Sequence, residues 1–209
     1  TGNYNSFWLV ERELDNRTSL IIDPPNGRVP PVTDAARERR RNQPRPAGGG
    51  RADSHERRSY LDRCISYGVP NLLAGYNSYF QIFQSADHVV ILQELIHDAR
   101  VVPLDESPHL DAAVRQLHGD SRGHWDGDTL VVETTNYSSR GAYRGATEGV
   151  RVIERFTRVS PDIVEYVVTF DDPDTWAQPW TLMIPLKGSD ESMFEYACHE
   201  GNYAIVGIL

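Results

Sequence analysis

Residues 150–170 read VRVIERFTRVSPDIVEYVVTF. Two runs rich in β-branched and aromatic residues flank Ser160-Pro161-Asp162. Val, Ile, Thr, Tyr and Phe favour strands, and a proline-containing break between two such runs marks a turn. The stretch therefore predicts an antiparallel hairpin, and the rest of the chain follows the same pattern.

A second hairpin is expected in residues 79–95, where YFQIFQS and HVVILQEL flank Ala86-Asp87. No long helical pattern alternates with the β-prone runs, so a βαβ fold is not expected. The predicted fold class is mainly β: an antiparallel β-barrel of the lipocalin or calycin type, or a closed sandwich, with a few short helices. Further strands, for about ten in all, are expected at residues 7–12, 18–23, 98–105, 129–137, 180–186 and 193–199.

Composition divides the single predicted domain into three stretches. Residues 1–33 combine N-terminal strands with the proline-rich turn DPPNGRVPP. Residues 34–58 are rich in Arg, Pro and Gly, which predicts an exposed loop with a short helix at its start. Few apolar side chains are present to offset ordering entropy, so residues 36–52 should be mobile. Residues 59–209 would form the barrel.

Charge and hydropathy narrow the range of partners. The net charge is −9, which argues against nucleic acid, because phosphate binding needs an excess of Lys and Arg. No run approaches the roughly 18 apolar residues that a membrane span needs. No signal peptide is visible, although the opening TGNYNSFW resembles a trimmed start, so a removed leader remains an alternative. The oligomeric state stays open, with a homodimer as one alternative.

The two cysteines, Cys64 and Cys198, allow one intramolecular pairing. In an exported protein this pair would form a disulfide, whereas in a cytosolic protein it would be two buried thiols. Neither cysteine lies in a CxxC or Cys/His spacing, so structural zinc is not expected.

Five motifs carry a resemblance to known proteins: RTSLIIDPPNGRVPP, ELIHDARVVPLD, GDSRGHWDGDTLVVETTNY, ERFTRV and EYACHEGNY. With them, the chain resembles a family of uncharacterised, typically exported bacterial β-rich proteins from about residue 17 onwards. The resemblance implies a periplasmic or secreted setting. It implies no activity that can be carried over to particular residues.

A first candidate site lies in residues 94–100, ELIHDAR. A histidine titrates near neutral pH and a neighbouring carboxylate can fix its tautomer, so His97 and Asp98 suit acid–base work. Arg100 would stabilise developing negative charge, and Glu94 would contact the substrate. In an unbroken strand His97 and Asp98 point to opposite faces, so a bulge is needed to bring them together. The alternative is a surface ladder of salt bridges.

A second candidate site lies in residues 195–203, EYACHEGNY. Glu195 and His199 share a face if this segment is a strand, and they would serve as acid and base or as metal ligands. His97 and His199 are thus the predicted acid and base, with Asp98 and Glu195 orienting or tuning them. The alternative is a terminal strand with polar decoration.

The motif GDSRGHWDGD, residues 119–128, is dense in polar groups. Asp120 and Asp126 have nearby backbone N–H groups to accept from, and two glycines suit a sharp backbone path. The motif therefore predicts a rigid corner at a pocket mouth, with a turn before the strand at Thr129. Ser121 lacks a G-x-S-x-G elbow, which argues against a serine nucleophile.

Cofactors are not predicted, because the chain has no Gly-rich phosphate loop and its seven histidines form no H-x-H or H-E-x-x-H pattern. A divalent metal held by dispersed ligands such as His97, His109 and His199 is an alternative. Aromatic side chains would line a pocket for a flat or sugar-like ligand, with the protein core as their alternative place. The predicted substrate-binding residues are Tyr79, Glu94, Arg122, Trp125, Trp180 and Tyr196.

The leading hypothesis is an acid–base enzyme, a lyase, isomerase or hydrolase, acting on a small organic, aromatic or sugar-like substrate in a barrel pocket. A noncatalytic lipocalin-like binding protein is the first alternative, and a metal-dependent enzyme with dispersed His and Glu ligands is the second. Two histidines in one cavity would favour the enzyme, and an apolar cavity away from both would favour the binding protein. The predicted catalytic residues are His97, Asp98, Arg100, Glu195 and His199.

Overall fold

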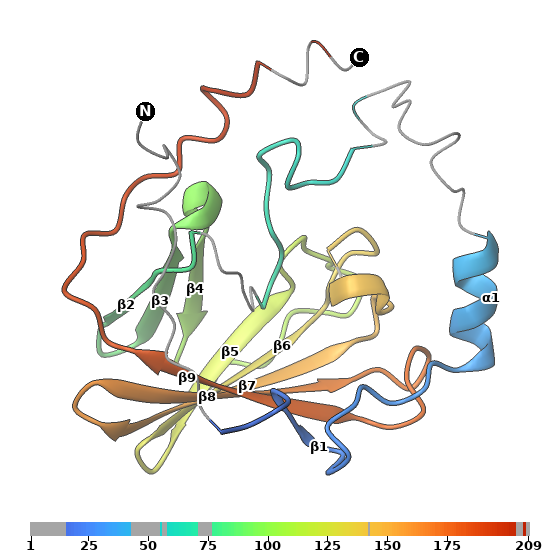
Figure 1. The fold of residues 1–209 in the computed structure, drawn as a ribbon, viewed down its shortest axis with the longest axis horizontal. Coiled ribbons are helices and arrows are strands. Elements are labelled where there is room, and N and C mark those ends of the chain that lie inside the picture. The colour runs from blue at the N-terminus through green and yellow to red at the C-terminus, as the bar shows by residue number, and fades with distance from the viewer. Residues whose placement is uncertain are drawn as a thin grey trace.

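The computed structural model describes residues 16–42, 55, 58–70, 77–141, 143–203 and 207. In these residues the fold is mainly β, as predicted, and its strands form two antiparallel sheets (Figure 1). The strand predicted at residues 7–12 lies outside the described residues. No helix in the described part of the chain has the length and apolar character needed to cross a membrane.

The larger sheet has six strands: β1 (Ile21–Asp23), β5 (Asp120–Asp126), β6 (Thr129–Thr135), β7 (Arg151–Ser160), β8 (Ile163–Asp171) and β9 (Trp180–Lys187). Their order is β1-β9-β8-β7-β6-β5, and every neighbouring pair is antiparallel. The hairpin predicted from residues 150–170 is β7 and β8, which are joined by a turn at Pro161 and Asp162.

The smaller sheet has three strands: β2 (Phe80–Gln84), β3 (His88–Gln93) and β4 (Ala99–Pro103). β2 and β3 form the hairpin predicted around Ala86-Asp87. The sheet stands against the β5 end of the larger sheet (Figure 1). Gly123 of β5 makes this approach possible, because a Cβ at this position would lie only 2.8 Å from side-chain atoms of Val102 and Leu104.

The closed barrel is not confirmed. Among the described strands, β1 and β5 form the two edges of the larger sheet, and β2 and β4 form the edges of the smaller one. Neither sheet pairs its own edges, which full closure requires. The coarser prediction of an antiparallel, mainly β fold therefore holds, and the lipocalin-like barrel does not follow from it.

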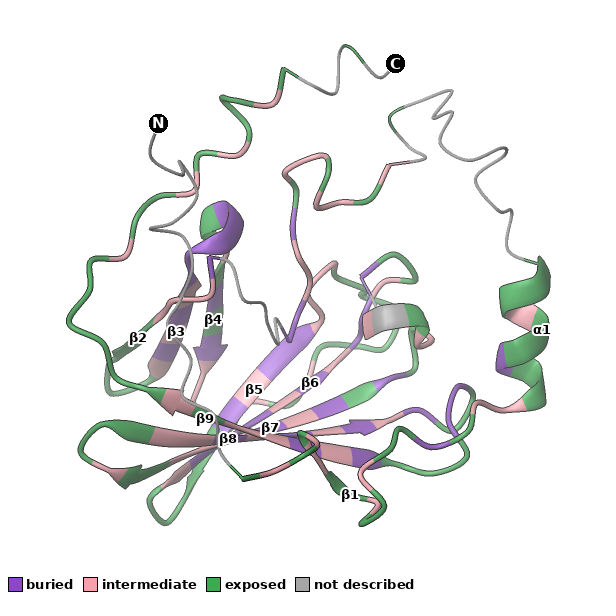
Figure 2. Cartoon of the chain, in the orientation of Figure 1, coloured by how far each residue is buried: buried purple, intermediate pink, exposed green. Residues whose placement is uncertain are grey.

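The core has two apolar clusters, visible as buried stretches in Figure 2. The first lies between the sheets, where Val89 and Ile91 of β3 and Val102 of β4 meet Leu130 and Val132 of β6. The second covers the other end of the larger sheet and is aromatic: Tyr137, Val150, Val152, Tyr166, Val168, Phe170, Trp176, Trp180 and Leu182. The alternating inward positions of the strands supply most of both clusters.

The predicted short helix at the start of residues 34–58 is present as α1 (Asp34–Asn42). Ala36 is buried, and Arg39 donates hydrogen bonds to the carbonyl oxygen of Asp174 and to Thr175 Oγ1. These contacts join the helix to the loop before β9, and its expected mobility stays a prediction. Residues 43–52, for which mobility was also expected, lie outside the described residues.

The strand predicted at residues 193–199 is wrong. After β9 the structure shows no strand up to residue 203, and residues 188–203 form an irregular path, here called the C-terminal segment. It leaves the larger sheet and rises past β2 toward the top of the smaller sheet (Figure 1). Alternation of side chains resembles a strand, but an extended segment becomes one only with a hydrogen-bonded neighbour.

The corner predicted for residues 119–128 is also wrong, because Asp120–Asp126 is strand β5 and pairs in register with β6. The predicted turn does exist. It contains Gly127, whose φ of 59° lies in the left-handed region that glycine tolerates best.

Candidate functional site

The first candidate segment is not an unbroken strand. After β3 the chain enters a short 3₁₀ turn, η3 (Leu95–His97), before β4 begins at Ala99. Ile96 and His97 both have positive φ, 62° and 46°, which the tight connection imposes on two non-glycine residues. Leu95 and Ile96 point into the protein, whereas His97 is exposed. A turn, rather than the bulge we expected, therefore sets the directions of His97 and Asp98.

The C-terminal segment is bound to this turn by two backbone contacts. The N–H of Phe194 donates to Glu94 Oε1 at 3.2 Å, and Nδ1 of His97 lies 3.4 Å from the carbonyl oxygen of Tyr196. Glu94 is almost completely buried, and burial raises the pKa of its carboxyl despite the hydrogen bond from Phe194. Glu94 therefore anchors the segment.

A disulfide holds the same segment on its other side. Cys64 and Cys198 are bonded, with their Cα atoms 5.6 Å apart. Close by, Asn202 Nδ2 donates to the carbonyl oxygen of Asp62 at 2.8 Å. The expected pairing of the two cysteines is thus present, and it joins the loop at residues 58–70 to the C-terminal segment.

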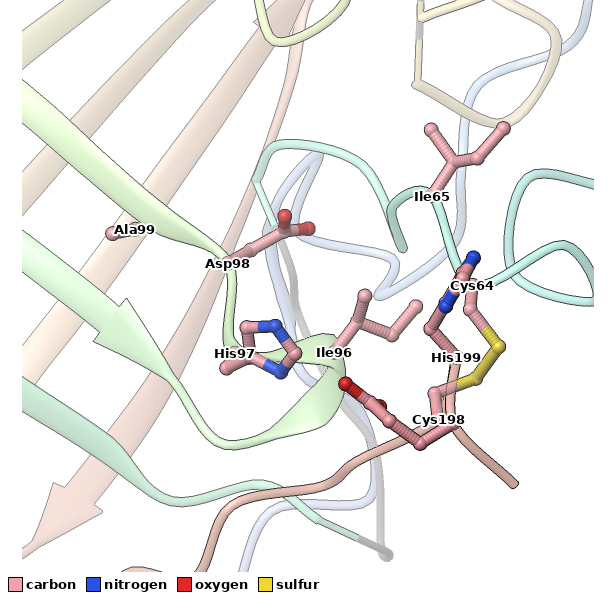
Figure 3. Close-up of a pocket in the computed structure, with 9 residues that line it drawn as sticks. Cys64, Ile65, Ile96, His97, Asp98, Ala99, Cys198 and His199 are labelled. Atoms are coloured by element: carbon pink, nitrogen blue, oxygen red, sulfur yellow. A yellow bond between two sulfur atoms is a disulfide. The ribbon is translucent and has the colours of Figure 1, made fainter. Parts of the chain in front are cut away.

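A pocket of about 400 Å³ lies between the turn, this loop and the C-terminal segment. Figure 3 shows His97 and Asp98 on one side of it, and the disulfide with His199 on the other. The sequence had singled out these three polar residues as catalytic, and the structure places them around one cavity. Its lining residues are Cys64, Ile65, Ile96, His97, Asp98, Ala99, Cys198, His199 and Glu200.

Arg100, also predicted to be catalytic, lies elsewhere. Its side chain points between the sheets, where its guanidinium forms a two-pronged ion pair with the carboxylate of Glu154 in β7. The hydroxyl of Tyr166 donates to the same carboxylate. Arg100 is 8% exposed and Glu154 is fully buried. We call Arg100–Glu154 the interior ion pair.

The electrostatics of the interior ion pair favour a fixed charge state. Burial disfavours the charge on Arg100, but the nearby carboxylate of Glu154 outweighs burial and raises the pKa of the guanidinium. Burial, and then the negative charge of Glu154, raise the pKa values of the Tyr137 and Tyr166 hydroxyls. With these shifts Arg100 stays protonated and the two phenols stay neutral near neutral pH, which fits a structural element better than a proton-transfer site.

The remaining predicted residues do not line the pocket. Trp180 is buried and stacks on Phe170 with ring centroids 4.5 Å apart, so the core alternative holds for it. Trp125 is 49% exposed near the tip of the β5–β6 hairpin. Glu195 is exposed on the C-terminal segment. The carbonyl oxygen of Tyr79 accepts a hydrogen bond from the N–H of Glu94. Tyr196 contributes the backbone contact to His97, and Arg122 lies on β5.

The polar groups of β5 bind other protein groups. Asp120 is buried and accepts from His109 Nδ1 at 2.8 Å and from the N–H of Leu110 at 3.0 Å, so it holds the preceding loop. Asp126 caps no backbone group in the described structure; its carboxylate accepts from Arg155 at 2.8 Å, and this bond lowers its pKa. The motif is therefore a hydrogen-bonded strand.

Metal binding finds no support among the described residues, which contain no group of three or more His, Cys, Asp or Glu side chains that could hold an ion. Of the three dispersed ligands considered, His97 and His199 line the pocket, but His109 is bound to Asp120.

Sequence reasoning missed two residues near the pocket and one in the interior ion pair. His118 lies beside Asp98 and Ser66 binds His118, and no pattern in the sequence links these residues, since they come from separate loops. Glu154 did leave a signal. It occupies the same face of its strand as Val152 and Phe156, and one carboxylate on an otherwise apolar face indicates a buried partner.

The pocket thus brings two imidazoles, from His97 and His199, together with two carboxylates, from Asp98 and Glu200. No protein-family model, curated protein or solved structure matches the chain. An imidazole can accept or donate a proton near neutral pH, and a carboxylate can orient it. Among the described lining residues none is Lys or Arg, so this part of the pocket offers proton transfer more readily than binding of an anion.

Proposed function

We propose that the protein is an acid–base enzyme that acts on a small organic substrate in this pocket. The observation that carries the proposal is the meeting of His97 and His199 around one cavity, although they come from segments on opposite sides of β5–β9 in the chain. The volume of about 400 Å³ falls within the range of small-molecule sites. In place of a barrel interior, the proposed site is a cavity at the end of the smaller sheet.

His97 is the proposed base. A carbonyl oxygen can only accept, so the contact with Tyr196 requires the proton of His97 to sit on Nδ1. Nε2 then carries the lone pair that removes a proton from a substrate C–H or from water. His199 is the proposed acid, which gives a proton to the leaving oxygen in a dehydration or hydrolysis and to a substrate carbon in an isomerisation. This pair of transfers serves a dehydration, an isomerisation or a hydrolysis.

We also propose that the protein works in the periplasm or outside the cell. The disulfide between Cys64 and Cys198 supports this setting, because disulfides persist in oxidising compartments. The resemblance of the motifs to exported proteins points the same way.

A noncatalytic binding protein is the second candidate, and the interior ion pair favours it. Arg100 would have stabilised negative charge in a transition state, but its guanidinium is bound to Glu154 and does not line the pocket. A binding protein needs no such group, whereas an enzyme must stabilise the developing charge by other means.

The test is a survey of turnover with p-nitrophenyl esters, p-nitrophenyl glycosides and small β-hydroxy ketones, whose dehydration produces an ultraviolet-absorbing enone. With the substrate class that reacts, H97Q and H199Q should each lower kcat by about 10²–10⁴-fold. H88Q is the matched control, because His88 lies far from the pocket lining in an exposed pair with Asp87. It should keep full activity.

Turnover that both pocket variants retain would refute the proposed roles of the two histidines. No turnover with any class, combined with ligand-induced chemical-shift changes at His97 and His199, would favour the binding protein instead.

A further inference from the structure

Asp98 lines the pocket, but one of its carboxylate oxygens lies near a histidine that is not part of the lining. The side chain lines the cavity, yet its Oδ2 atom is buried and has no hydrogen-bond partner among the described residues. Oδ2 lies 3.8 Å from Nε2 of His118. The same Nε2 lies 2.5 Å from Ser66 Oγ. Asp98 therefore connects the pocket to an imidazole that does not line it.

This Ser–His–Asp group is not a nucleophilic triad. In a triad the serine and the carboxylate bind opposite nitrogens of the imidazole, so that the carboxylate orients the base. Here Ser66 and Asp98 both approach Nε2. Ser66 is also only 3% exposed, so its hydroxyl is poorly placed to attack a substrate.

Ser66 is better placed to hold the imidazole. The N–H of Gly68 donates to Ser66 Oγ at 2.8 Å, which leaves the hydroxyl proton free to point at Nε2. The loop at residues 58–70 thereby fixes the ring of His118 next to Asp98.

The charges around His118 act in opposite directions. Burial lowers its pKa, Asp98 raises it, and the positive charge of Arg100 lowers it. Across the cavity, Asp98 shares the lining with His97, His199 and Glu200. His118 remains 28% exposed, so it can exchange protons with water.

We propose that His118 is a positioning residue for Asp98, with which it shares a proton, and that Ser66 holds its imidazole in place for that exchange. When Asp98 takes up a proton in the pocket, the Ser66 hydroxyl turns so that its oxygen accepts at Nε2 instead of donating. The proton then passes from Oδ2 to Nε2 of His118, and the imidazolium loses this same Nε2 proton to water, which restores the starting state. A movement of about 1 Å would bring the two atoms within hydrogen-bond distance. The proposal rests on the pocket being the site of acid–base chemistry.

The test is a pH titration of the full, disulfide-bonded chain by NMR, following the carboxyl carbon of Asp98 and the ring nitrogens of His118. In the wild type, the Asp98 signal should shift at the pH where His118 titrates. In H118Q, whose amide nitrogen replaces Nε2 but cannot titrate, this shift should disappear. In D98N the pKa of His118 should fall, because the charge that raises it is gone.

H88Q is the control, since it removes a titrating histidine next to another carboxylate, and it should leave the Asp98 curve unchanged. In S66A the ring nitrogens of His118 should shift, because Nε2 loses its partner. Phenylmethylsulfonyl fluoride should leave Ser66 unmodified by intact mass.

The proposal would be overturned if the chemical shift of the Asp98 carboxyl carbon did not change at the pH where His118 titrates. It would also be overturned if D98N left the pKa of His118 unchanged. Sulfonylation of Ser66 would also overturn it, because the serine would then act as a nucleophile. These readouts need no substrate, so they fail or succeed independently of the turnover survey.

Discussion

The interior ion pair and the pocket use the same kinds of side chain to opposite effect. Arg100 and Glu154 lie on neighbouring parts of two sheets and face each other, with both terminal guanidinium nitrogens bound to the carboxylate. His97 lies on a turn and His199 on an irregular segment. Among the described residues, His97 has a backbone contact with Tyr196, and neither histidine has an ion-pair partner. Distance along the chain does not distinguish the two sites, since both join remote segments.

The difference lies in the element that carries each group. In a strand, the alternation of side chains and the register of pairing fix where an inward charge points, so a partner can meet it with good geometry. On the turn at residues 95–97 no such register acts, and the side chain of His97 is left exposed to solvent. The strand-borne pair Arg100–Glu154 is therefore structural, whereas the two histidines on connections, His97 and His199, remain exposed.

The largest expected effect comes from breaking the interior ion pair. R100M leaves the carboxylate of Glu154 buried without its counter-charge, and we expect the free energy of unfolding to fall by about 3–5 kcal/mol. Urea denaturation measures this change. The double variant R100M/E154M removes both charges and should recover most of the loss. A double variant less stable than R100M would contradict a structural role for the pair.

The second expected effect concerns the disulfide. It joins two segments that line the pocket, whereas the interior ion pair joins the two sheets. The variant C64S/C198S should lower the free energy of unfolding by about 2–4 kcal/mol. Hydrogen exchange should rise in residues 190–203 but not in β7, because only the pocket depends on the link. Reductant should destabilise the wild type and leave the variant unchanged. Equal loss of protection in β7 would show that the two regions are not separable.

The third expected effect lies where the sheets meet. A methyl group at Gly123 would press on Val102 and Leu104, so G123A should destabilise the protein by about 1–3 kcal/mol. G149A is the matched control, because a Cβ at Gly149 would make only an ordinary contact at 3.4 Å. Thermal unfolding distinguishes the two variants. A G123A protein as stable as G149A would mean that the sheets can move apart without cost.

The smallest expected effect is a pH dependence of the free energy of unfolding, which comes from His118 beside the pocket. Burial lowers the pKa of His118 in the folded state, so below about pH 6.5 the unfolded chain binds more protons than the folded one. Stability should therefore fall as pH drops from this value to the lower folded-state pKa. H118Q should flatten that part of the curve, as measured by urea denaturation at each pH. Arg100, whose pKa is raised further above its already high ordinary value, should add no slope near neutral pH.

The strands could be predicted where both partners of a hairpin are close in sequence. The runs on either side of Pro161 and of Ala86-Asp87 carry their own turn signals, and both hairpins form as expected. Closure of the sheet could not be predicted, because alternation reports which side of a strand is apolar but not which strand lies beside it. The same ambiguity made residues 193–199 look like a strand.

The site could be predicted in part, for a similar reason. His97, Asp98 and His199 were recognisable as acid–base groups from their types and neighbours. The geometry that separates them from Arg100 depends on the positive φ values at Ile96 and His97. These values could not be predicted, because non-glycine residues rarely adopt positive φ. Ser66 and His118 become neighbours of Asp98 only through the tertiary fold.

The position of Cys198 has a consequence for the order of events during biosynthesis. It follows every described strand in the chain, and its partner Cys64 precedes β2. The ribosome therefore synthesises all residues of both sheets before those that close the pocket. A shortened chain that stops after β9 would contain all nine described strands yet lack His199 and the bond that holds it. Closure of the pocket by the disulfide therefore needs residues that are made after the whole β scaffold, and it needs an oxidant.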